Sequence, residues 1–552
     1  MKNKIFILII SIAAIVLLSK CTKDFLDKSP QDSPTATNFF VNETSARQAV
    51  TAIIQNWSTY WLYGGGYMPT YLDICTDDAW LYGNRDNQPW RHAWTNLDFT
   101  PGYSAIGGDH MHYWWQFIYI SINDASFAAD YIPLSSDLTF TPEMQKKYIG
   151  VAKMMRAFAY INLTTLWGDV PLHKHLLTDA AESFVAASPK SEILQFAIND
   201  LVYATENVPN SWDGNSVGLP TKAAAAGFLA KAYLYAQKFD SAEIAAKNAL
   251  DIADASGYGL MDDYAYMMAE ASQPNKEFIF ALEFIPNQTL NGVGAPLSNQ
   301  GIVYRGVRDD PTFIQNLAIG GLGAGFGYAM PTRNLVDAFE PGDPRRKASM
   351  WLAGDYFNVI YHGPTILDKN PYTGKTTRFR DGDSVKYQNG WAPGNVNSRK
   401  MVSSVLGLSN VEKSGYDIPI LRYAELYLYY AEALIENNKF NEGMIQLNKV
   451  RARPSVHMPA LTATDQADAR AKLRHERRIE LNMEGIRIYD LLRWGIMQDI
   501  FGAGPDTHKI LGMVGNDTIY KETNLVFPKN NHLPIPQEEI DLNKKLLQNT
   551  GY

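Results

Sequence analysis

The sequence predicts a mostly α-helical protein, in which helical hairpins form a scaffold and a large irregular portion is rich in loops. Two observations predict the scaffold: a hairpin pattern at residues 221–252 and its recurrence at residues 422–453. A third observation predicts the irregular portion. Twenty of the 40 glycines fall within residues 253–420, and glycine disfavours the interior of helices. The scaffold is therefore expected to be interrupted by a long insertion.

The first hairpin begins at Thr221, which follows a proline and is a plausible N-cap. Residues spaced by three and four positions share one face of a helix, and the first helix places Ala226, Leu229, Ala230 and Tyr233 on such a face. After a short turn the second helix repeats the pattern with Ala242, Ala245, Ala249 and Ile252. Small residues at the crossing allow close approach, so this stretch resembles a tetratricopeptide hairpin, whose period is about 34 residues.

The same layout recurs further along the chain. In residues 422–453 the positions of Ala230, Tyr233, Phe239 and Ala242 are taken by Ala431, Leu434, Phe440 and Gly443. Further helical pairs are expected at residues 143–167 with 191–207, and at residues 465–500. One hairpin cannot bury its apolar face alone, whereas stacked hairpins bury a continuous core. The repeats therefore predict a tetratricopeptide-like α-α superhelix.

Composition and charge exclude one class of partner. The chain has 552 residues, 46% of them hydrophobic and 20% charged, as in ordinary globular proteins. Its formal net charge is −8 and its sequence pI is about 5.7. Because no basic surplus is available to neutralise phosphates, nucleic acid is not an expected partner.

The N-terminus is predicted to be a processing signal. Lysines precede an apolar run at residues 5–18, which is about 14 residues long and too short for a stable membrane-spanning helix. The run ends in Leu18-Ser19-Lys20-Cys21, which resembles a bacterial lipobox, although Lys20 stands where a small residue is usual. Residues 1–20 are thus a predicted lipoprotein signal peptide and Cys21 the lipidated residue. The alternative is an ordinary secretory signal followed by an incidental cysteine.

Aromatic residues are concentrated after a polar tether that contains Pro30 and Pro34. Seven of the twelve tryptophans lie within residues 57–115. Trp114 and Trp115 are expected in a helical core, whereas Trp80, Trp90 and Trp94 alternate with polar groups that include Asp77, Asp78 and Arg85. Sugars present C–H faces to aromatic rings and hydroxyls to polar partners, so these six residues form a candidate ligand-binding site. The alternative is that the tryptophans pack an irregular N-terminal layer.

Four regions are predicted along the chain. The signal peptide at residues 1–20 precedes an N-terminal region at residues 21–252, which contains the aromatic-rich loops and the first hairpins. A loop-rich insertion follows at residues 253–420, with one buried strand expected at residues 277–285, and a helical region completes residues 421–552. Loops on a rigid scaffold often carry recognition.

Other chemistry-bearing patterns predict structure rather than catalysis. Arginine and glutamate alternate at helical spacing in residues 470–495, which predicts structural ion pairs, including Glu484 with Arg487. The G-x-S-x-G match at residues 214–218 lacks the strand and helix that a nucleophile elbow needs. The histidines at residues 110, 112, 173 and 175 have no clear third metal ligand. We therefore expect no catalytic residue, metal or cofactor, and no disulfide for Cys75.

Several motifs occur together along the chain. They are Arg156-Ala157-Phe158-Ala159-Tyr160 with Leu166-Trp167-Gly168-Asp169-Val170-Pro171-Leu172, Glu476-Arg477-Arg478-Ile479-Glu480-Leu481, Asp490-Leu491-Leu492-Arg493-Trp494-Gly495, and the terminal Asn549-Thr550-Gly551-Tyr552. Together with Cys21 followed by Asp24-Phe25-Leu26-Asp27, they resemble the SusD/RagB family of Bacteroidetes surface lipoproteins. The resemblance covers the whole mature chain.

This resemblance implies a cell-surface glycan-binding lipoprotein of the outer membrane, without catalytic activity. It would deliver its ligand to a SusC-like TonB-dependent outer-membrane transporter. It also implies a second wall of the site in the loop before Pro331-Thr332, where Phe326 and Tyr328 stand. Two alternatives stay open: an oligopeptide-binding lipoprotein of the same family, and an endo-glycanase.

Overall fold

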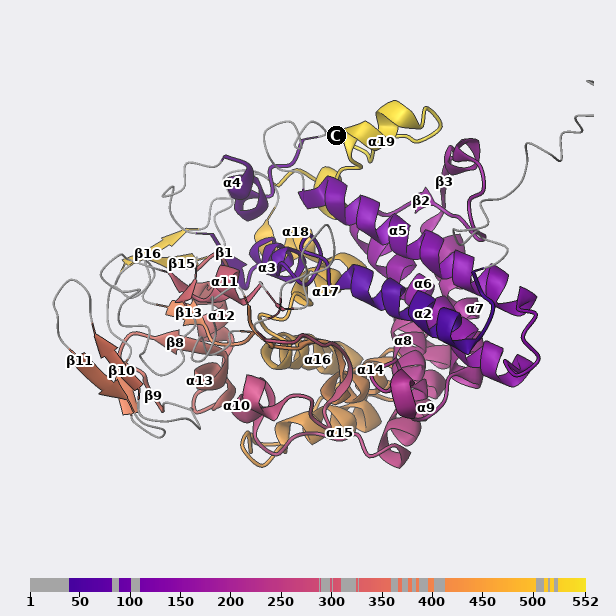
Figure 1. The fold of residues 1–552 in the computed structure, drawn as a ribbon. Helices are drawn as coiled ribbons and strands as arrows, with labels where there is room; N and C mark the ends of the chain where they lie inside the picture. Colours follow the sequence, from indigo (N-terminus) through magenta and orange to yellow (C-terminus); the bar gives the residue numbers. More distant parts are fainter. Residues whose placement is uncertain are drawn as a thin grey trace, which may run out of the picture.

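The structure is a computed structural model, and the part of the chain that it describes has several gaps. It comprises residues 39–81, 89–100, 110–286, 288, 298–299, 301–308, 324–325, 327–358, 366–369, 376–379, 384–386, 396–401, 413–502, 511–514, 517–520 and 525–552. The described part is mostly helical, which confirms the predicted fold class. In Figure 1 the long helices lie on one side and most of the short strands on the other.

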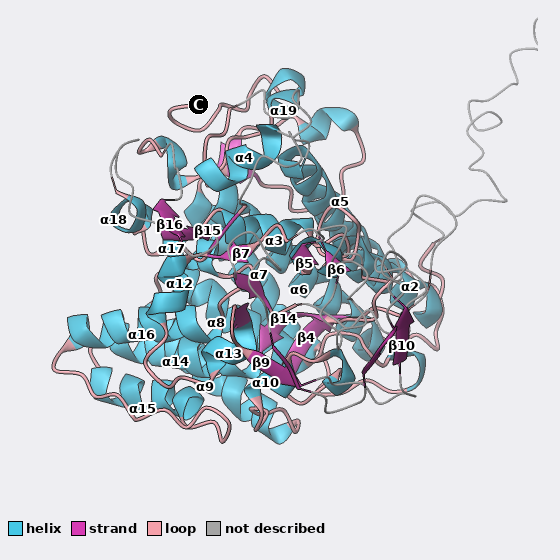
Figure 2. Ribbon diagram, turned by 90° about the vertical axis from the view of Figure 1, so that its left-hand side faces the viewer, coloured by secondary structure: helices cyan, strands magenta, loops and turns pink. Residues whose placement is uncertain are grey.

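Three antiparallel helix pairs form the scaffold, as predicted. They are α6 (Pro142–Trp167) with α7 (Lys190–Asn207), α8 (Lys222–Tyr235) with α9 (Phe239–Ala255), and α14 (Tyr423–Glu436) with α15 (Phe440–Arg451). Helix α9 packs directly against α14, so the hairpins on either side of the long insertion stack as neighbours. Figure 2 shows α8, α9, α14 and α15 grouped together.

Helix α8 is enclosed by protein on most of its circumference, because it packs against α7, α9 and α14. Ala226 and Ala230 are buried as predicted, whereas Leu229 and Tyr233 are only half-buried. Thr221 occupies the N-cap position, but its side chain makes no capping hydrogen bond. In α15 the counterpart of Ala242 is Gly443, where a Cβ would lie 2.9 Å from the carbonyl oxygen of Ala431, the counterpart of Ala230.

The last predicted pair of helices is instead three helices: α16 (Gln466–Glu480), α17 (Arg487–Arg493) and α18 (Met497–Phe501). The break lies between α16 and α17, where Met483 and Gly485 have φ values of 58° and 76°. Glycine adopts such a conformation without strain. A Cβ on Gly485 would also lie 2.9 Å from the Cα of Pro69, so this turn packs closely on helix α3.

The N-terminal layer covers α6 and consists of α2 (Glu43–Trp57), α3 (Tyr67–Ile74), α4 (Pro89–Asn96) and α5 (His110–Tyr131). Asn42 and Ser45 form a capping box at the start of α2, which satisfies backbone groups that the helix leaves unpaired. Trp114 and Trp115 on α5 are buried, which confirms their predicted place in the core.

The strands are short and pair two by two. Antiparallel pairing of β4 (Phe278–Leu282) with β14 (Ile418–Arg422) brings the two ends of the insertion together, and β4 lies within the predicted strand. The other strands are β1 (Ala79–Trp80), β2 (Val170–Pro171), β3 (Ala187–Ser188), β5 (Val307–Arg308), β6 (Ala324–Gly325), β7 (Met330–Pro331), β8 (Met350–Leu352), β9 (Tyr356–Asn358), β10 (Ile366–Lys369), β11 (Thr376–Phe379), β12 (Ser384–Lys386), β13 (Val396–Ser398), β15 (Leu511–Val514) and β16 (Asp517–Tyr520). The short helices are α10 (Tyr264–Met267), α11 (Ile302–Arg305), α12 (Arg333–Ala338), α13 (Arg345–Ser349) and α19 (Gln537–Leu542).

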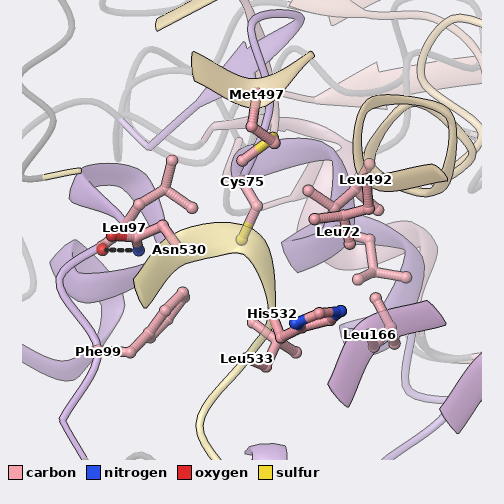
Figure 3. Close-up of a pocket in the computed structure, with 11 residues that line it drawn as sticks. Leu72, Cys75, Leu97, Phe99, Leu166, Leu492, Met497, Asn530, His532 and Leu533 are labelled. Atoms are coloured by element: carbon pink, nitrogen blue, oxygen red, sulfur yellow. Dashed lines mark hydrogen bonds between the residues drawn. The ribbon is translucent and has the colours of Figure 1, made fainter. Parts of the chain in front are cut away.

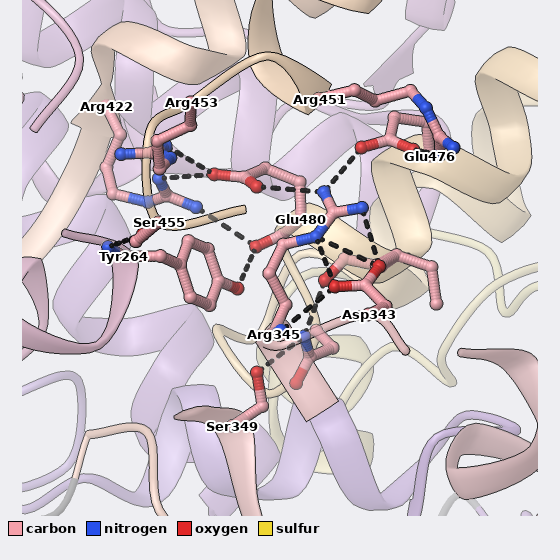
Figure 4. A network of polar contacts seen from close by, with 12 residues as sticks. Tyr264, Asp343, Arg345, Ser349, Arg422, Arg451, Arg453, Ser455, Glu476 and Glu480 are labelled. Carbon is pink, nitrogen blue, oxygen red and sulfur yellow. Dashed lines mark hydrogen bonds and ion pairs between the residues drawn. The ribbon is translucent and has the colours of Figure 1, made fainter. Parts of the chain in front are cut away.

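A buried ion-pair network ties α16 to the insertion and to the last hairpin, as Figure 4 shows. The carboxylate of Glu480 lies 3.0 Å from Arg453 and 3.2 Å from both Arg345 and Arg422. All four side chains are almost completely buried. The structural ion-pair network predicted from the alternating charges is therefore confirmed.

One predicted pair within this network is wrong. Glu484 pairs with Arg422 and Lys400 instead of with Arg487. Arg487 points to Asp77, 410 positions earlier in the chain. Because Arg422 also contacts Glu480, it separates the two carboxylates that would otherwise repel each other.

Candidate functional site

The two loops predicted to form the site meet at a short antiparallel ladder. Trp80 in β1 pairs with Met330 in β7, and Ala79 pairs with Pro331. The chain that leaves β1 and the chain that enters β7 therefore lie at the same edge of the ladder. This register brings Leu81, which follows β1, to the same edge as Tyr328 and Ala329, which precede β7. The predicted walls beyond them, residues 82–88 and Phe326, lie outside the described residues.

Asp77 and Asp78 are buried in this structure and bind arginines of the C-terminal region. Asp77 accepts hydrogen bonds of 2.9 and 3.0 Å from Arg487, and Asp78 accepts one of 2.6 Å from Arg478. Burial alone would raise the pKa of Asp77, but Arg478 and Arg487 outweigh it and hold that pKa below its usual range. The expectation of direct ligand contact is corrected here: both carboxylates are occupied by arginine and fix the base of β1.

Trp80, Trp94 and Tyr328 are also enclosed by protein. Trp80 and Tyr328 are 3% exposed and Trp94 is not exposed at all. The Trp94 ring packs against Tyr71, Phe99 and Trp114 at centroid distances of 5.0–5.2 Å. Trp94 therefore fills the N-terminal layer, which was the alternative explanation for these tryptophans, and its ring offers no open face to a sugar here.

The other predicted site residues lie outside the described part of the structure. They are Arg85 and Phe326, together with the side chain of Trp90 and the predicted lipidation site Cys21. Their roles stay predictions.

An aromatic cluster lies beneath the β1–β7 edge and joins α3, α5 and α11. Its centre is Tyr67, whose hydroxyl lies 2.7 Å from that of Tyr60 and 2.6 Å from that of Tyr304. Tyr304 packs on Tyr328 at a centroid distance of 5.4 Å and accepts a 2.7 Å hydrogen bond from its backbone N–H. The cluster thus connects α3 to the chain that enters β7, and we define it as Tyr60, Trp61, Tyr67, Tyr71, His110, Tyr113 and Tyr304.

Part of this cluster reaches the surface. Tyr60, Trp61 and Tyr113 are half-buried, and the rings of Trp61 and Tyr113 stack at 4.0 Å with an interplanar angle of 14°. The sequence analysis missed these residues as site candidates. The concentration of tyrosines around Trp57 and Trp61 was the available signal, but the contact to Tyr304, more than 200 positions away, was not visible in it.

The chemistry of this region suits binding. Burial raises the pKa of Tyr304, and its neighbours Tyr67 and Tyr60 raise it further, so its hydroxyl stays neutral. The nearby carboxylates of Asp73, Asp77 and Asp78 are paired with Arg305, Arg487 and Arg478. Among the described residues, the cluster therefore contains no pair of available carboxyl groups such as glycoside hydrolysis requires.

A small internal cavity behind α3 is too small for a sugar. Its volume is about 20 Å³, and Cys75, Leu97, Met497, Asn530 and His532 contribute to its wall (Figure 3). This space suffices for one water molecule, whereas ligand sites usually measure about 300–1,000 Å³. Within the described residues, no group of three or more histidine, cysteine, aspartate or glutamate side chains could hold a metal ion.

Comparison with known proteins places this arrangement in a family. Residues 276–552 match the model of the SusD family, and residues 24–234 match a family described as starch-binding and associating with the outer membrane. The chain belongs to the SusD family. In the described part no helix is both long and apolar enough to cross a membrane.

Individual relatives are distant, and two of those described here extend along most of the chain. A SusD-like protein of Bacteroides ovatus is 24% identical over 90% of this chain and 83% of its own length. SusD-like protein P25 of Formosa agariphila is 24% identical over 98% of this chain and 99% of its own length. Starch-binding protein SusD of Bacteroides thetaiotaomicron is 30% identical over 40% of this chain and 37% of its own length.

Solved structures share the fold. A SusD-like protein from Bacteroides fragilis superimposes with a TM-score of 0.72 at 22% identity, covering 95% of this chain and all of that one. A laminarin-binding SusD-like protein gives 0.70 at 21% identity, covering 93% of this chain and all of that one.

Proposed function

We propose that this protein is a glycan-binding lipoprotein of the outer membrane, exposed at the cell surface and without catalytic activity. The observation that carries the proposal is the β1–β7 register, which sets Trp80 beside Met330, together with the packing of Tyr328, just before β7, on Tyr304 of the aromatic cluster. Rings stack on the C–H faces of sugars, while a half-buried hydroxyl such as that of Tyr60 can bind sugar hydroxyls.

The comparisons support a glycan as the ligand. The matched N-terminal family is described as starch-binding, one structural neighbour is a laminarin-binding protein, and another is a surface glycan-binding protein in complex with laminarihexaose. Starch and laminarin oligosaccharides are therefore the first ligands to test.

Within this proposal, Trp90, Arg85 and Phe326 contact the glycan from the two stretches, and Trp61 and Tyr113 extend the surface. Asp77, Asp78, Trp80, Trp94 and Tyr328 hold the edge in place from below. Delivery of the ligand to a SusC-like TonB-dependent transporter completes the proposed function. The lipid on Cys21 would anchor the protein beside that transporter.

The test is calorimetry of the purified protein with maltohexaose and laminarihexaose, followed by the double variant W61A/W90A. A stacking ring contributes about 1–2 kcal/mol when the aromatic-pair scale is extended to sugars. Loss of two rings should therefore weaken binding about 30-fold or more. Trp80 is a poor target, because it is buried and pairs with Met330.

Tyr266→Ala is the matched control, because Tyr266 is a surface aromatic residue, 37% exposed, on α10. Its affinity for glycan should equal that of the wild type. Undiminished affinity in a well-folded W61A/W90A variant would place the site elsewhere. The appearance of new reducing ends during incubation with either oligosaccharide would contradict the non-catalytic assignment.

A further inference from the structure

A second, larger concavity lies away from the aromatic cluster, between α5, residues 171–184 and the C-terminal α19. Its volume is about 680 Å³, within the range of small-molecule sites. Helix α5 contributes to both places with different residues: His110 and Tyr113 belong to the cluster, whereas Tyr119, Ile120 and Asp124 line this α5–α19 groove.

The walls of the α5–α19 groove carry exposed apolar side chains. Ile120, Phe184 and Leu542 come from its three different sides and are 39%, 38% and 67% exposed. Exposed apolar groups gathered around one concavity are typical of a binding site. The apolar walls therefore favour a ligand with an apolar body.

Two carboxylates in the groove set the charge of that ligand. Asp124 from α5 and Glu539 from α19 line it, and neither forms an ion pair within the described part of the chain. Burial raises the pKa of Asp124 and of Glu539; His112 and a hydrogen bond from Trp115 oppose the rise for Glu539. Both side chains are half-buried, and a protonated amine in the groove would give each of them a counter-charge.

His173, the histidine that lines the groove, does not supply a positive charge. Burial lowers the pKa of His173, which lines the groove, so its ring is neutral near pH 7. His112 lies 4.0 Å from another carboxylate, that of Glu538.

We propose that the α5–α19 groove binds a small organic cation, whose protonated amine is recognised by Asp124 and Glu539 and whose apolar body lies against Ile120, Phe184 and Leu542. The ligand supplies the positive charge that the fold omits here and covers the exposed apolar walls. This site is independent of the proposed glycan site.

The test uses three probes of equal length with the full mature protein: hexylammonium, neutral hexan-1-ol and anionic hexanoate. Calorimetry should detect saturable binding of hexylammonium, weaker binding of hexan-1-ol and none of hexanoate. The double variant D124N/E539Q should weaken hexylammonium binding at least about tenfold, because the ammonium group loses its hydrogen bonds to two charged carboxylates. The affinity of this variant for hexan-1-ol should not fall. A general disruption of the groove would weaken binding of both probes.

Asp541→Asn is the matched control, because Asp541 stands on the same helix, is exposed and does not line the groove. It should bind hexylammonium as the wild type does. A second variant, Ile120→Trp, should block all binding by filling the groove from its rim. Equal affinity of the wild type for the amine and the alcohol would overturn the proposal. Undiminished binding of hexylammonium by D124N/E539Q would also overturn it, as would an absence of saturable hexylammonium binding by the wild type. None of these results affects the glycan proposal, whose readout is oligosaccharide affinity.

Discussion

Three distant parts of the chain meet at Glu480. Its carboxylate contacts Arg345 from the insertion, Arg422 from the end of β14 and Arg453 from beyond α15. All of these groups have lost their water, and desolvation of charges is costly unless each one is paired. The network therefore does not add stability in proportion to its number of pairs, but removal of one member leaves uncompensated charge behind.

Glu480→Gln is expected to destabilise the protein by about 3–5 kcal/mol, because three buried guanidinium groups lose a shared anion. Urea unfolding measures the change. Glu436→Gln is the control: it breaks the pair with Arg470, which is partly exposed, and should cost about 0.2–1 kcal/mol. A similar loss in the free energy of unfolding for both variants would mean that burial does not determine how much these ion pairs matter for stability.

The same residue predicts a pH dependence. Burial alone would raise the pKa of Glu480, but Arg453, Arg422 and Arg345 outweigh it and lower the pKa to about 2 from a usual 4.5. A group with a depressed folded-state pKa contributes stability above its unfolded pKa and loses that contribution as the pH falls toward the folded value. The stability difference between wild type and Glu480→Gln should therefore shrink between pH 4.5 and pH 2. A stability difference between the two proteins that stays constant from pH 7 to pH 3 would contradict this prediction.

At the scale of elements, the scaffold depends on small residues where helices cross. Ala230 on α8 is completely buried, and α8 packs against three neighbouring helices. Ala230→Leu should overpack this position and cost roughly 1–3 kcal/mol, visible as a lower midpoint of thermal unfolding.

Ala255→Leu provides the comparison, because Ala255 ends α9 and is exposed. It should leave the midpoint nearly unchanged. Equal midpoints for wild type and Ala230→Leu would show that this crossing is loosely packed. Neither variant should change glycan affinity while it remains folded.

The elements also show what the sequence could predict. The hairpins were predictable because helical periodicity is local: the bounds of α6, α7, α14 and α15 agree closely with the expected ranges. The partners of Asp77 were not predictable from a local pattern, because Arg478 and Arg487 lie some 400 positions away in the sequence. Exposure of Trp94 was misjudged for the same reason, since its neighbours Tyr71 and Trp114 come from other elements. A local pattern shows which residues could bind a sugar but does not show which of them remain open.

At the scale of the whole molecule, the long insertion does not divide the protein into separate halves. The β4–β14 pair closes its ends, and α9 stacks on α14 across it. The C-terminal residues return to the N-terminal half, where the Asn549 side chain donates 2.8 Å hydrogen bonds to the carbonyls of Trp167 and Leu533. Substitutions at the scaffold should therefore destabilise the molecule as one cooperative unit.

The attachment of this unit to the membrane rests on Cys21 in our proposal. The apolar run at residues 5–18 has about 14 residues, fewer than the roughly 20 that a spanning helix needs. Cys21→Ala should therefore move the protein from the membrane fraction to the soluble fraction in cells that lack the partner transporter. The measurement is fractionation after a high-salt wash, which removes electrostatically bound protein.

Cys75→Ala is the matched control, because Cys75 is the second of only two cysteines and is buried in the folded body. It should stay with the outer membrane. If Cys21→Ala also stays there after the wash, the lipid does not hold the protein, and the ordinary secretory signal becomes the better interpretation of residues 1–20. Glycan affinity in solution should be equal in both variants, because neither residue belongs to the proposed site, so loss of attachment and loss of binding can be told apart.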